Sequence, residues 1–275
     1  MEFESPRYAD VGGRRLAYSE CSPEHPEGTI LLLIGFSARR LSWYRQLPVL
    51  GTRFRTLTVD YRDIGDSDPY LEEYTLADQA DDMAALLTAL SIDKTHVVGL
   101  SMGGFVAQEL ALRHPEKVDH LVLVATSSGG AAHVPASEEI LKSLFVREHL
   151  EVGELARKNY GIFTLPGHFE RHPEDWDIVA AIARHTPLKR DAYFRQLRST
   201  AHHDTTGRLS QLSQPTLIVH GLEDPLVPII NARRLAAAIP NAHLQVYEQC
   251  GHIPSMEHPE RFNADVMAFV AEQRA

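Results

Sequence analysis

The chain has 275 residues, of which 44% are hydrophobic and 23% are charged. This composition is ordinary for a globular protein, and the length is enough for one large domain or a domain with an inserted module. With 27 basic and 37 acidic residues, the formal net charge is −10. An acidic balance of this kind argues against binding to nucleic acid or to an anionic membrane surface.

Two features of the chain bear on its compartment. The two cysteines do not form a disulfide framework, so we expect reduced thiols. The N-terminal stretch MEFESPRY has neither the basic nor the apolar region of a secretory signal, and the apolar runs 29–36 and 120–126 are too short to span a bilayer. We therefore expect a cytoplasmic protein without a membrane partner. We also expect it to be a monomer or a homodimer.

The first half of the chain alternates β-rich runs with helical patterns. Residues 14–21 have the pattern of an amphipathic strand, and runs that are apolar on both faces, as in buried parallel strands, follow at 29–35, 54–61, 95–100 and 119–126. Thr75 and Asp78 are typical of a capping pair at the start of a helix, and a second helical pattern covers 102–113. This alternation predicts βαβ units and a parallel, doubly wound sheet.

The alternation stops in the middle of the chain. From Ser128 to about His203 the patterns are helical, at 137–150, 174–185 and 190–200, with no convincing buried strand. The alternation then resumes with a strand at 215–221, a helix at 229–238, a strand at 242–249 and a final helix from about Glu260. We therefore predict a core made of residues 1–127 and 204–275, with residues 128–203 inserted as a helical cap.

The string GLSMG, residues 99–103, fits the pattern G-x-S-x-G between a predicted strand and a predicted helix. In that context the chain makes a sharp turn that holds Ser101 in a strained conformation. The flanking glycines, Gly99 and Gly103, remove side chains that would collide with the neighbouring strand and helix. The Ser101 hydroxyl would then lie at the carboxyl end of the sheet, at the start of a helix. The motif predicts a nucleophilic serine.

A serine hydroxyl needs a base to take its proton, and the base needs an acid to orient it. His252 follows the last predicted strand on a loop that reaches the same sheet edge. The acid is predicted in the loop after strand 215–221, where Asp224 is favoured and Glu223 is the neighbour to discount. The other usual place for the acid, after strand 119–126, has only serines.

Other histidines are given other roles. His220, at the end of a buried strand, is interpreted as packing, and two histidines that precede prolines are interpreted as structural: His114 and His258. His202 and His203 could suggest a metal pair, but no carboxylate or cysteine cluster completes it. We predict no metal and no cofactor.

With these residues the sequence resembles the α/β-hydrolase family over nearly its whole length, and residues 59–68 resemble the D-x-R-x-x-G-x-S loop of that family. The resemblance implies a mostly parallel eight-stranded sheet flanked by helices, with a helical cap after strand 6. It implies Ser101, Asp224 and His252 as the catalytic triad. The sequence resembles the lid-bearing serine esterases, enol-lactonases and methylesterases more than other branches of the family.

The oxyanion hole is the place where the sequence departs from the family. The loop after strand 29–35 usually contains His-Gly, and here Ile34 stands in place of the histidine. Because the donors are backbone groups, we expect the N–H groups of Phe36 and Met102 to form the hole. The adjacent arginines, Arg39 and Arg40, are interpreted as a solvated pair on the loop rather than as an anion hook.

The resemblance implies a serine hydrolase of esters or lactones that acts on small to medium, apolar substrates through an acyl-enzyme. Ring-cleavage carbon–carbon hydrolases share the triad but usually have tryptophan after the histidine, where this chain has Ile253. A cofactor-free perhydrolase or haloperoxidase and a slow-turnover ligand receptor of the same fold remain open. The residues expected to contact the substrate are Phe36, Met102, Ile253 and cap aromatics such as Phe145, Phe163 and Trp176.

Overall fold

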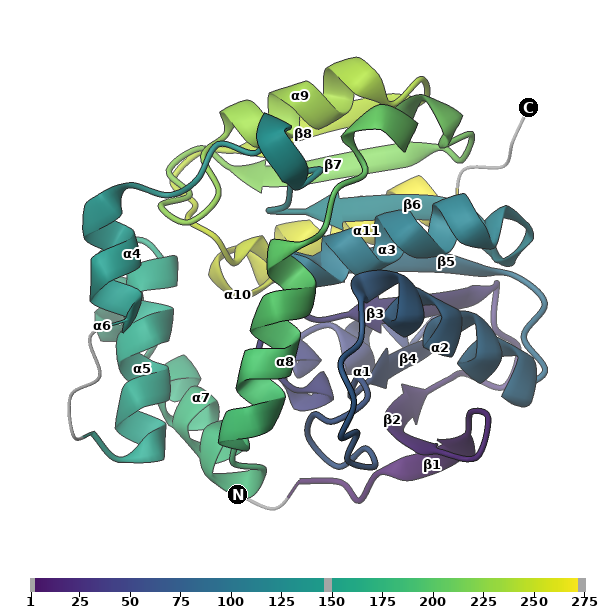
Figure 1. The fold of residues 1–275 in the computed structure, drawn as a ribbon, viewed down its shortest axis with the longest axis horizontal. Coiled ribbons are helices and arrows are strands. Elements are labelled where there is room, and N and C mark those ends of the chain that lie inside the picture. The colour runs from purple at the N-terminus through teal and green to yellow at the C-terminus, as the bar shows by residue number, and fades with distance from the viewer. Residues whose placement is uncertain (1–2, 146–149, 272–275) are drawn as a thin grey trace.

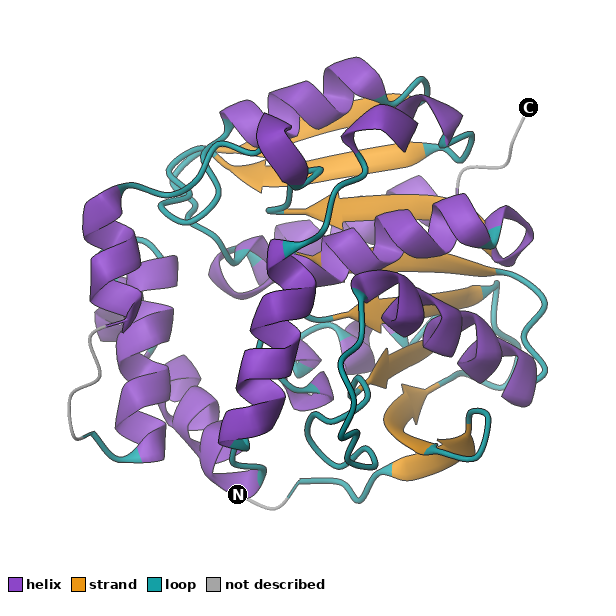
Figure 2. Ribbon diagram, in the orientation of Figure 1, coloured by secondary structure: helices purple, strands orange, loops and turns teal. Residues whose placement is uncertain are grey.

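An eight-stranded sheet forms the centre of the molecule (Figures 1 and 2). The computed structural model describes residues 3–145 and 150–271, and of Phe145 only the backbone. The strands lie in the order β1-β2-β4-β3-β5-β6-β7-β8. The pairs β1–β2 and β2–β4 are antiparallel and all other neighbours are parallel. The predicted fold class, a mostly parallel eight-stranded α/β sheet, is confirmed.

The strands are β1 (Arg7–Asp10), β2 (Arg15–Cys21), β3 (Thr29–Leu33), β4 (Arg55–Val59), β5 (Thr95–Leu100), β6 (Val118–Val124), β7 (Thr216–Gly221) and β8 (Ala242–Tyr247). Every residue of β5 and β7 is buried, including His96 and His220, as expected of mostly apolar strands that are covered on both faces. The sequence patterns locate seven of the eight strands. They miss β1, which has four residues, three of them exposed.

Helices cover both faces of the sheet. The core helices are α1 (Leu47–Leu50), α2 (Leu76–Ala89), α3 (Met102–Arg113), α9 (Ile230–Ala238), α10 (Pro254–Glu257) and α11 (Pro259–Ala271). In Figure 1, α2 and α3 lie in front of the sheet and α1 and α11 lie behind it. The predicted capping pair at the start of α2 is a full capping box: the Thr75 hydroxyl accepts from the Asp78 N–H, and the Asp78 carboxylate accepts from the Thr75 N–H.

Between β6 and β7, the described residues form helices and no strand of the central sheet. These helices are α4 (Glu138–Phe145), α5 (Val152–Phe163), α6 (His168–Arg171), α7 (Pro173–His185) and α8 (Arg190–Ala201). Figures 1 and 2 show them together beyond the end toward which the arrowheads of β6 and β7 point. The sequence patterns miss α5, although Glu151 and Glu154 form a capping box at its start. Part of the helical pattern at 137–150 falls on residues 146–149, outside the described residues.

No helix in the described part of the chain is long and apolar enough to cross a membrane. That the protein is cytoplasmic remains a prediction.

The loop after β3 is anchored by a buried charge cluster. Arg40 is fully buried, and its Nη1 lies 2.6 Å from Asp60 Oδ2 and 2.7 Å from Asp66 Oδ2. The Asp60 carboxylate also accepts from the Arg40 N–H at 2.7 Å. Gly65 has φ +61°, and a Cβ there would lie 2.3 Å from that carboxylate. The interpretation of Arg39 and Arg40 as a solvated pair is therefore wrong, because both side chains are buried and hydrogen-bonded within the protein.

The first prediction concerns this cluster. Arg40→Met should lower the free energy of unfolding by about 3–5 kcal/mol, because it leaves the fully buried Asp60 carboxylate without its cation. Urea unfolding monitored by circular dichroism measures the loss. Arg53→Met is the matched control: the Arg53–Glu27 pair is 42% and 48% exposed, so its loss should cost less than about 1 kcal/mol. Equal effects of the two substitutions would contradict the assignment of Arg40 as an anchor.

Candidate active site

The turn between β5 and α3 has the geometry that its sequence predicts. Ser101 lies between the two elements with φ +55° and ψ −118°, a conformation that L residues rarely adopt. A Cβ at Gly103 would lie 2.2 Å from the Leu33 carbonyl oxygen, and one at Gly99 would lie 2.4 Å from the Gly103 carbonyl oxygen. The two glycines are therefore required by the close approach of β3, β5 and α3.

Backbone and side-chain hydrogen bonds hold the strained turn. The Ser101 N–H donates to the Val124 carbonyl at 2.8 Å, and the Thr126 hydroxyl donates to the Ser101 carbonyl at 2.8 Å. A Cβ at Gly35 would lie 3.3 Å from Ser101 Cβ, so the loop after β3 passes directly beside the serine. The turn thus presents Ser101 at the carboxyl edge of the sheet, next to the loop that contains Phe36.

The loops after β7 and β8 bring an acid and a base together. His252 Nδ1 lies 2.8 Å from Asp224 Oδ2, and both residues are buried. The other carboxylate oxygen of Asp224 accepts from the N–H groups of Leu226 at 2.8 Å and Val227 at 2.9 Å. Because a carboxylate only accepts, Nδ1 of His252 is the donor in this bond, and in the neutral ring the lone pair is then on Nε2. This is the tautomer that a general base needs.

Glu223 is separated from this pair. Its side chain is exposed, and its Oε2 accepts from the Cys250 N–H at 3.1 Å. The turn therefore points only Asp224 toward His252.

His220 lies on the other side of Asp224, a contact that the packing interpretation did not include. The ring is fully buried, and its Nε2–H donates to the Val227 carbonyl at 2.7 Å while Nε2 lies 3.4 Å from Asp224 Oδ2. Burial lowers the pKa of His220, which favours the neutral ring. His220 therefore holds the Asp224–Val227 turn without adding a second cation.

The loop that contains His252 is tied to the segment after α5. The His252 N–H donates to the Phe163 carbonyl at 2.7 Å. Glu257 accepts from the N–H groups of Gly251 at 3.0 Å and Ile253 at 3.3 Å, and also from Leu165 at 2.8 Å. Burial raises the pKa of the Glu257 carboxyl. The sequence analysis missed Glu257, because nothing in the string MEHPE indicates contacts with residue 165.

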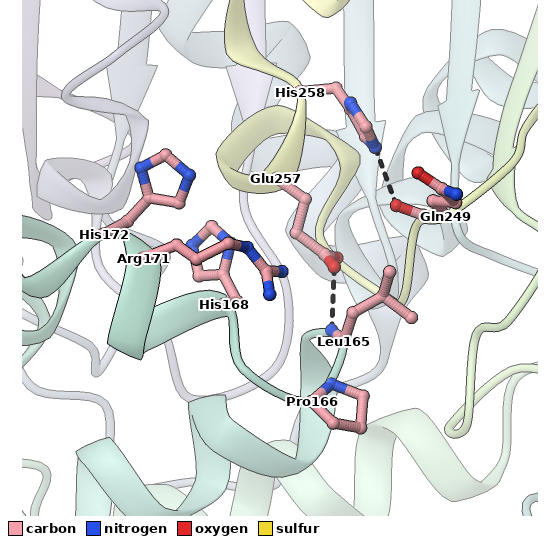
Figure 3. A pocket seen from close by; sticks show the side chains of 8 residues that line it. All are labelled: Leu165, Pro166, His168, Arg171, His172, Gln249, Glu257 and His258. Atoms are coloured by element: carbon pink, nitrogen blue, oxygen red, sulfur yellow. Dashed lines mark hydrogen bonds between the residues drawn. The ribbon is translucent and has the colours of Figure 1, made fainter.

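A pocket of about 440 Å³ lies beside this linkage, and Figure 3 shows the Glu257–Leu165 hydrogen bond within it. None of its lining residues is a predicted site residue. They are Leu165, Pro166, His168, Arg171, His172, Gln249, Glu257 and His258.

Two backbone N–H groups beside Ser101 are available to an oxyanion. Met102 is the first residue of α3, where an N–H has no carbonyl partner within the helix. The Phe36 N–H donates to no protein group in the described part of the chain, whereas the next N–H, that of Ser37, donates to Gln196 Oε1 at 2.7 Å. The Tyr61 hydroxyl donates to the Ile34 carbonyl at 3.1 Å. This bond supports the loop at the position where the family usually has histidine.

The residues expected to contact the substrate are not all in one place. The Phe163 ring lies edge-on to the His252 ring, with centroids 5.8 Å apart. Ile253 is buried next to His252. Trp176 packs against Phe169 and has no ring contact with His252 in the described part of the chain. The side chain of Phe145 lies outside the described residues.

Two clusters of possible metal ligands occur among the described residues: His96, Asp119 and His120, and His172, Glu174 and Asp175. Neither shares a residue with the Ser101 site. His202 and His203 belong to neither cluster. His203 stacks on Phe105, and burial lowers its pKa to about 4.

The family model for the alpha/beta hydrolase fold matches residues 28–259. The chain is 30% identical to 2-hydroxy-6-oxononadienedioate/2-hydroxy-6-oxononatrienedioate hydrolase 2 of Pseudomonas putida, over 98% of this chain and 97% of that protein. It is 30% identical to the putative carbamate hydrolase RutD of Caulobacter vibrioides, over 88% and 89% of the two chains. A thermophilic esterase from Thermogutta terrifontis superposes with a TM-score of 0.77 at 26% identity, over 97% of this chain and 98% of that one.

Proposed function

Because the chain belongs to the α/β-hydrolase family, we propose that it is a serine hydrolase that cleaves carboxylic esters or lactones through an acyl-enzyme on Ser101. The observation that supports the proposal most strongly is the pairing of His252 with Asp224, at the sheet edge where the strained turn presents Ser101. A catalytic triad needs these three groups in these roles.

In the proposed reaction, Ser101 Oγ attacks the substrate carbonyl carbon while His252 Nε2 takes the hydroxyl proton. The Asp224 carboxylate accepts from Nδ1–H and stabilises the imidazolium that forms. The N–H groups of Phe36 and Met102 donate to the carbonyl oxygen as it becomes negative. His252 then protonates the departing alkoxide, and the C–O bond breaks.

The second half of the reaction uses water as the nucleophile. His252 takes a proton from water as the oxygen attacks the acyl carbon, and the same two N–H groups stabilise the second oxyanion. When the intermediate collapses, Ser101 leaves with the proton from His252. The products are the carboxylic acid and the free enzyme, and for a lactone the acid and the alcohol belong to one molecule.

The helical segment 128–203 is proposed to act as a cap over the site, on a core made of residues 1–127 and 204–275. Two contacts support this assignment: the bond between the His252 N–H and the Phe163 carbonyl, and the bond between the Ser37 N–H and Gln196. Both link the inserted helices to loops that follow strands of the central sheet, and the loop after β3 passes beside Ser101.

The apolar groups near the triad favour an apolar substrate of small to medium size. Phe36, Phe163 and Ile253 lie beside the proposed oxyanion donors and His252, and none of them has a charge. The similarity to an esterase at 26% identity agrees with an ester substrate.

A carbon–carbon hydrolase is the second candidate function. The 30% identity to an oxononadienedioate hydrolase favours it. Ile253 argues against it, because such enzymes usually have tryptophan after the catalytic histidine. Another relative is a putative carbamate hydrolase, so the bonds named for the relatives also include the carbamate bond.

A substrate panel tests the reaction type. The wild-type protein should hydrolyse p-nitrophenyl esters or lactones of graded chain length with multiple turnovers, and Ser101→Ala should abolish this activity while the circular dichroism spectrum is unchanged. A 6-oxo-2-hydroxydienoate and a carbamate are the comparison substrates. Turnover of the dienoate or the carbamate without turnover of any ester or lactone would contradict the proposal, and so would a single turnover followed by tight binding or activity that depends on peroxide.

The assignment of the acid has its own matched pair of variants. Asp224→Asn should reduce kcat by about three orders of magnitude or more, because an amide no longer stabilises the imidazolium or selects the Nδ1–H tautomer. Glu223→Gln should leave kcat within about threefold of the wild-type value, because its side chain is exposed and does not contact His252. Steady-state kinetics on one ester measure both. A larger loss in Glu223→Gln would show that Asp224 is not the acid.

A further inference from the structure

Ser37, the residue after Phe36, has φ +58°, a left-handed conformation that is uncommon for residues other than glycine. Such a conformation persists when the surroundings hold it in place. In Ser37 both backbone polar groups are bound by side chains: Gln196 accepts from its N–H, and Arg39 donates to its carbonyl. These two side chains therefore hold the Ser37 backbone in place.

Gln196 reaches the loop from α8. Its side chain is fully buried, and its Oε1 lies 2.7 Å from the Ser37 nitrogen. The orientation of the carboxamide is fixed, because an N–H donor must face the oxygen and not the NH₂ group. Its Nε2 is buried without a hydrogen-bond partner among the described residues. The Gln196 carboxamide therefore bonds to the Ser37 N–H through its oxygen, while its NH₂ group is left as an unsatisfied donor.

Arg39 links the same residue to the inserted segment a second time. Its Nε donates to the Thr186 carbonyl at 2.9 Å, and Thr186 lies between α7 and α8. The guanidinium is buried and bridges the Thr186 and Ser37 carbonyls. Tyr193 of α8 also packs edge-on against Phe36, with ring centroids 5.0 Å apart. Two side chains of α8, Gln196 and Tyr193, thus contact residues 37 and 36 directly, and Thr186 is linked to Ser37 through Arg39.

The position of this contact matters for the proposed oxyanion hole. The N–H groups of Phe36 and Ser37 belong to consecutive peptide planes that share the Phe36 Cα. Fixing the Ser37 N–H on Gln196 therefore restricts the rotation that would turn the Phe36 N–H away from Ser101. The same hydrogen bond keeps the Ser37 N–H paired with Gln196.

We propose that Gln196 is a positioning residue that holds the oxyanion loop from α8, so that the cap completes the oxyanion hole. This inference rests on the proposed function, because it concerns the N–H groups assigned there to the oxyanion. Gln196 acts through the loop and does not itself contact the reacting atoms.

Three variants of α8 test the inference. Gln196→Met keeps the length and burial of the side chain and removes the acceptor for the Ser37 N–H. Gln196→Glu keeps an acceptor oxygen and removes the unsatisfied NH₂ group. Arg198→Gln is the control, since the Arg198–Glu73 pair also ties α8 to the core but is exposed and lies on another loop. The measurements are kcat and KM for an ester that the wild-type enzyme hydrolyses, and the affinity for a trifluoromethyl ketone, whose Ser101 adduct has an oxyanion.

Gln196→Met should lower kcat by about 10- to 100-fold, because displacement of a catalytic group by about 1 Å has effects of that size. KM should change by less than about threefold, and trifluoromethyl ketone affinity should fall by a factor similar to the loss of kcat. Gln196→Glu should restore most of both, and Arg198→Gln should match the wild-type protein. Thermal unfolding of each variant separates these effects from loss of the fold.

Wild-type kcat and ketone affinity in a folded Gln196→Met protein would overturn the inference. A lower thermal midpoint with no selective loss of kcat would also overturn it, by assigning Gln196 a packing role alone. If Gln196→Glu folds and is as impaired as Gln196→Met, the oxygen is not the group that matters. Failure of the proposed function gives a different result, since the wild-type protein would then hydrolyse no ester or lactone.

Discussion

The close contact between β3, β5 and the start of α3 is the constraint on which the site depends. The Leu33 carbonyl oxygen would lie 2.2 Å from any Cβ at residue 103, so only glycine permits α3 to begin so near the sheet. Ser101, two residues before this contact, has positive φ. The Ser101 side chain therefore lies at the carboxyl edge of the sheet. Strands β3, β7 and β8 also end at this edge, and their loops begin there. Each group of the proposed mechanism reaches the site from one of these loops or from α3.

The sequence was most informative about reactive residues that directly follow a predicted strand. Ser101, Asp224 and His252 each follow a predicted strand, and parallel strands end at one edge, so their approximate neighbourhood could be inferred from the sequence alone. Gly99 and Gly103 were predictable for the same reason, because the turn between strand and helix is local. β1 could not be found because four mostly exposed residues have no hydrophobic pattern.

Residues whose role depends on distant partners were missed or misinterpreted. Arg40 and Arg39 are adjacent charges in a loop, which usually indicates solvent exposure, and the pairing of Arg40 with Asp60 and Asp66 exists only in the folded chain. Glu257 binds N–H groups both in the segment after α5 and in the loop after β8, and Gln196 binds a loop 159 residues away in sequence. No local pattern distinguishes such residues from ordinary helix positions.

The same contacts explain how one fold can serve relatives that act on different bonds. Ser101, Asp224 and His252 all follow strands of the central sheet, whereas the inserted helices contact both the His252 loop and the loop after β3. Changes in the inserted segment can therefore alter substrate and oxyanion geometry while the core remains the same. The names of the relatives, a dienedioate hydrolase, a carbamate hydrolase and an esterase, are consistent with this division.

The central claim is that Ser101 is a nucleophile activated by His252. Reaction with an alkyl fluorophosphonate tests it most directly, because an activated serine displaces fluoride and forms a stable bond to phosphorus. Peptide mass spectrometry should locate one phosphonyl group per chain on Ser101, and a folded His252→Ala protein should react far more slowly. Modification of a different residue, or no modification of the folded wild-type protein, would contradict the account.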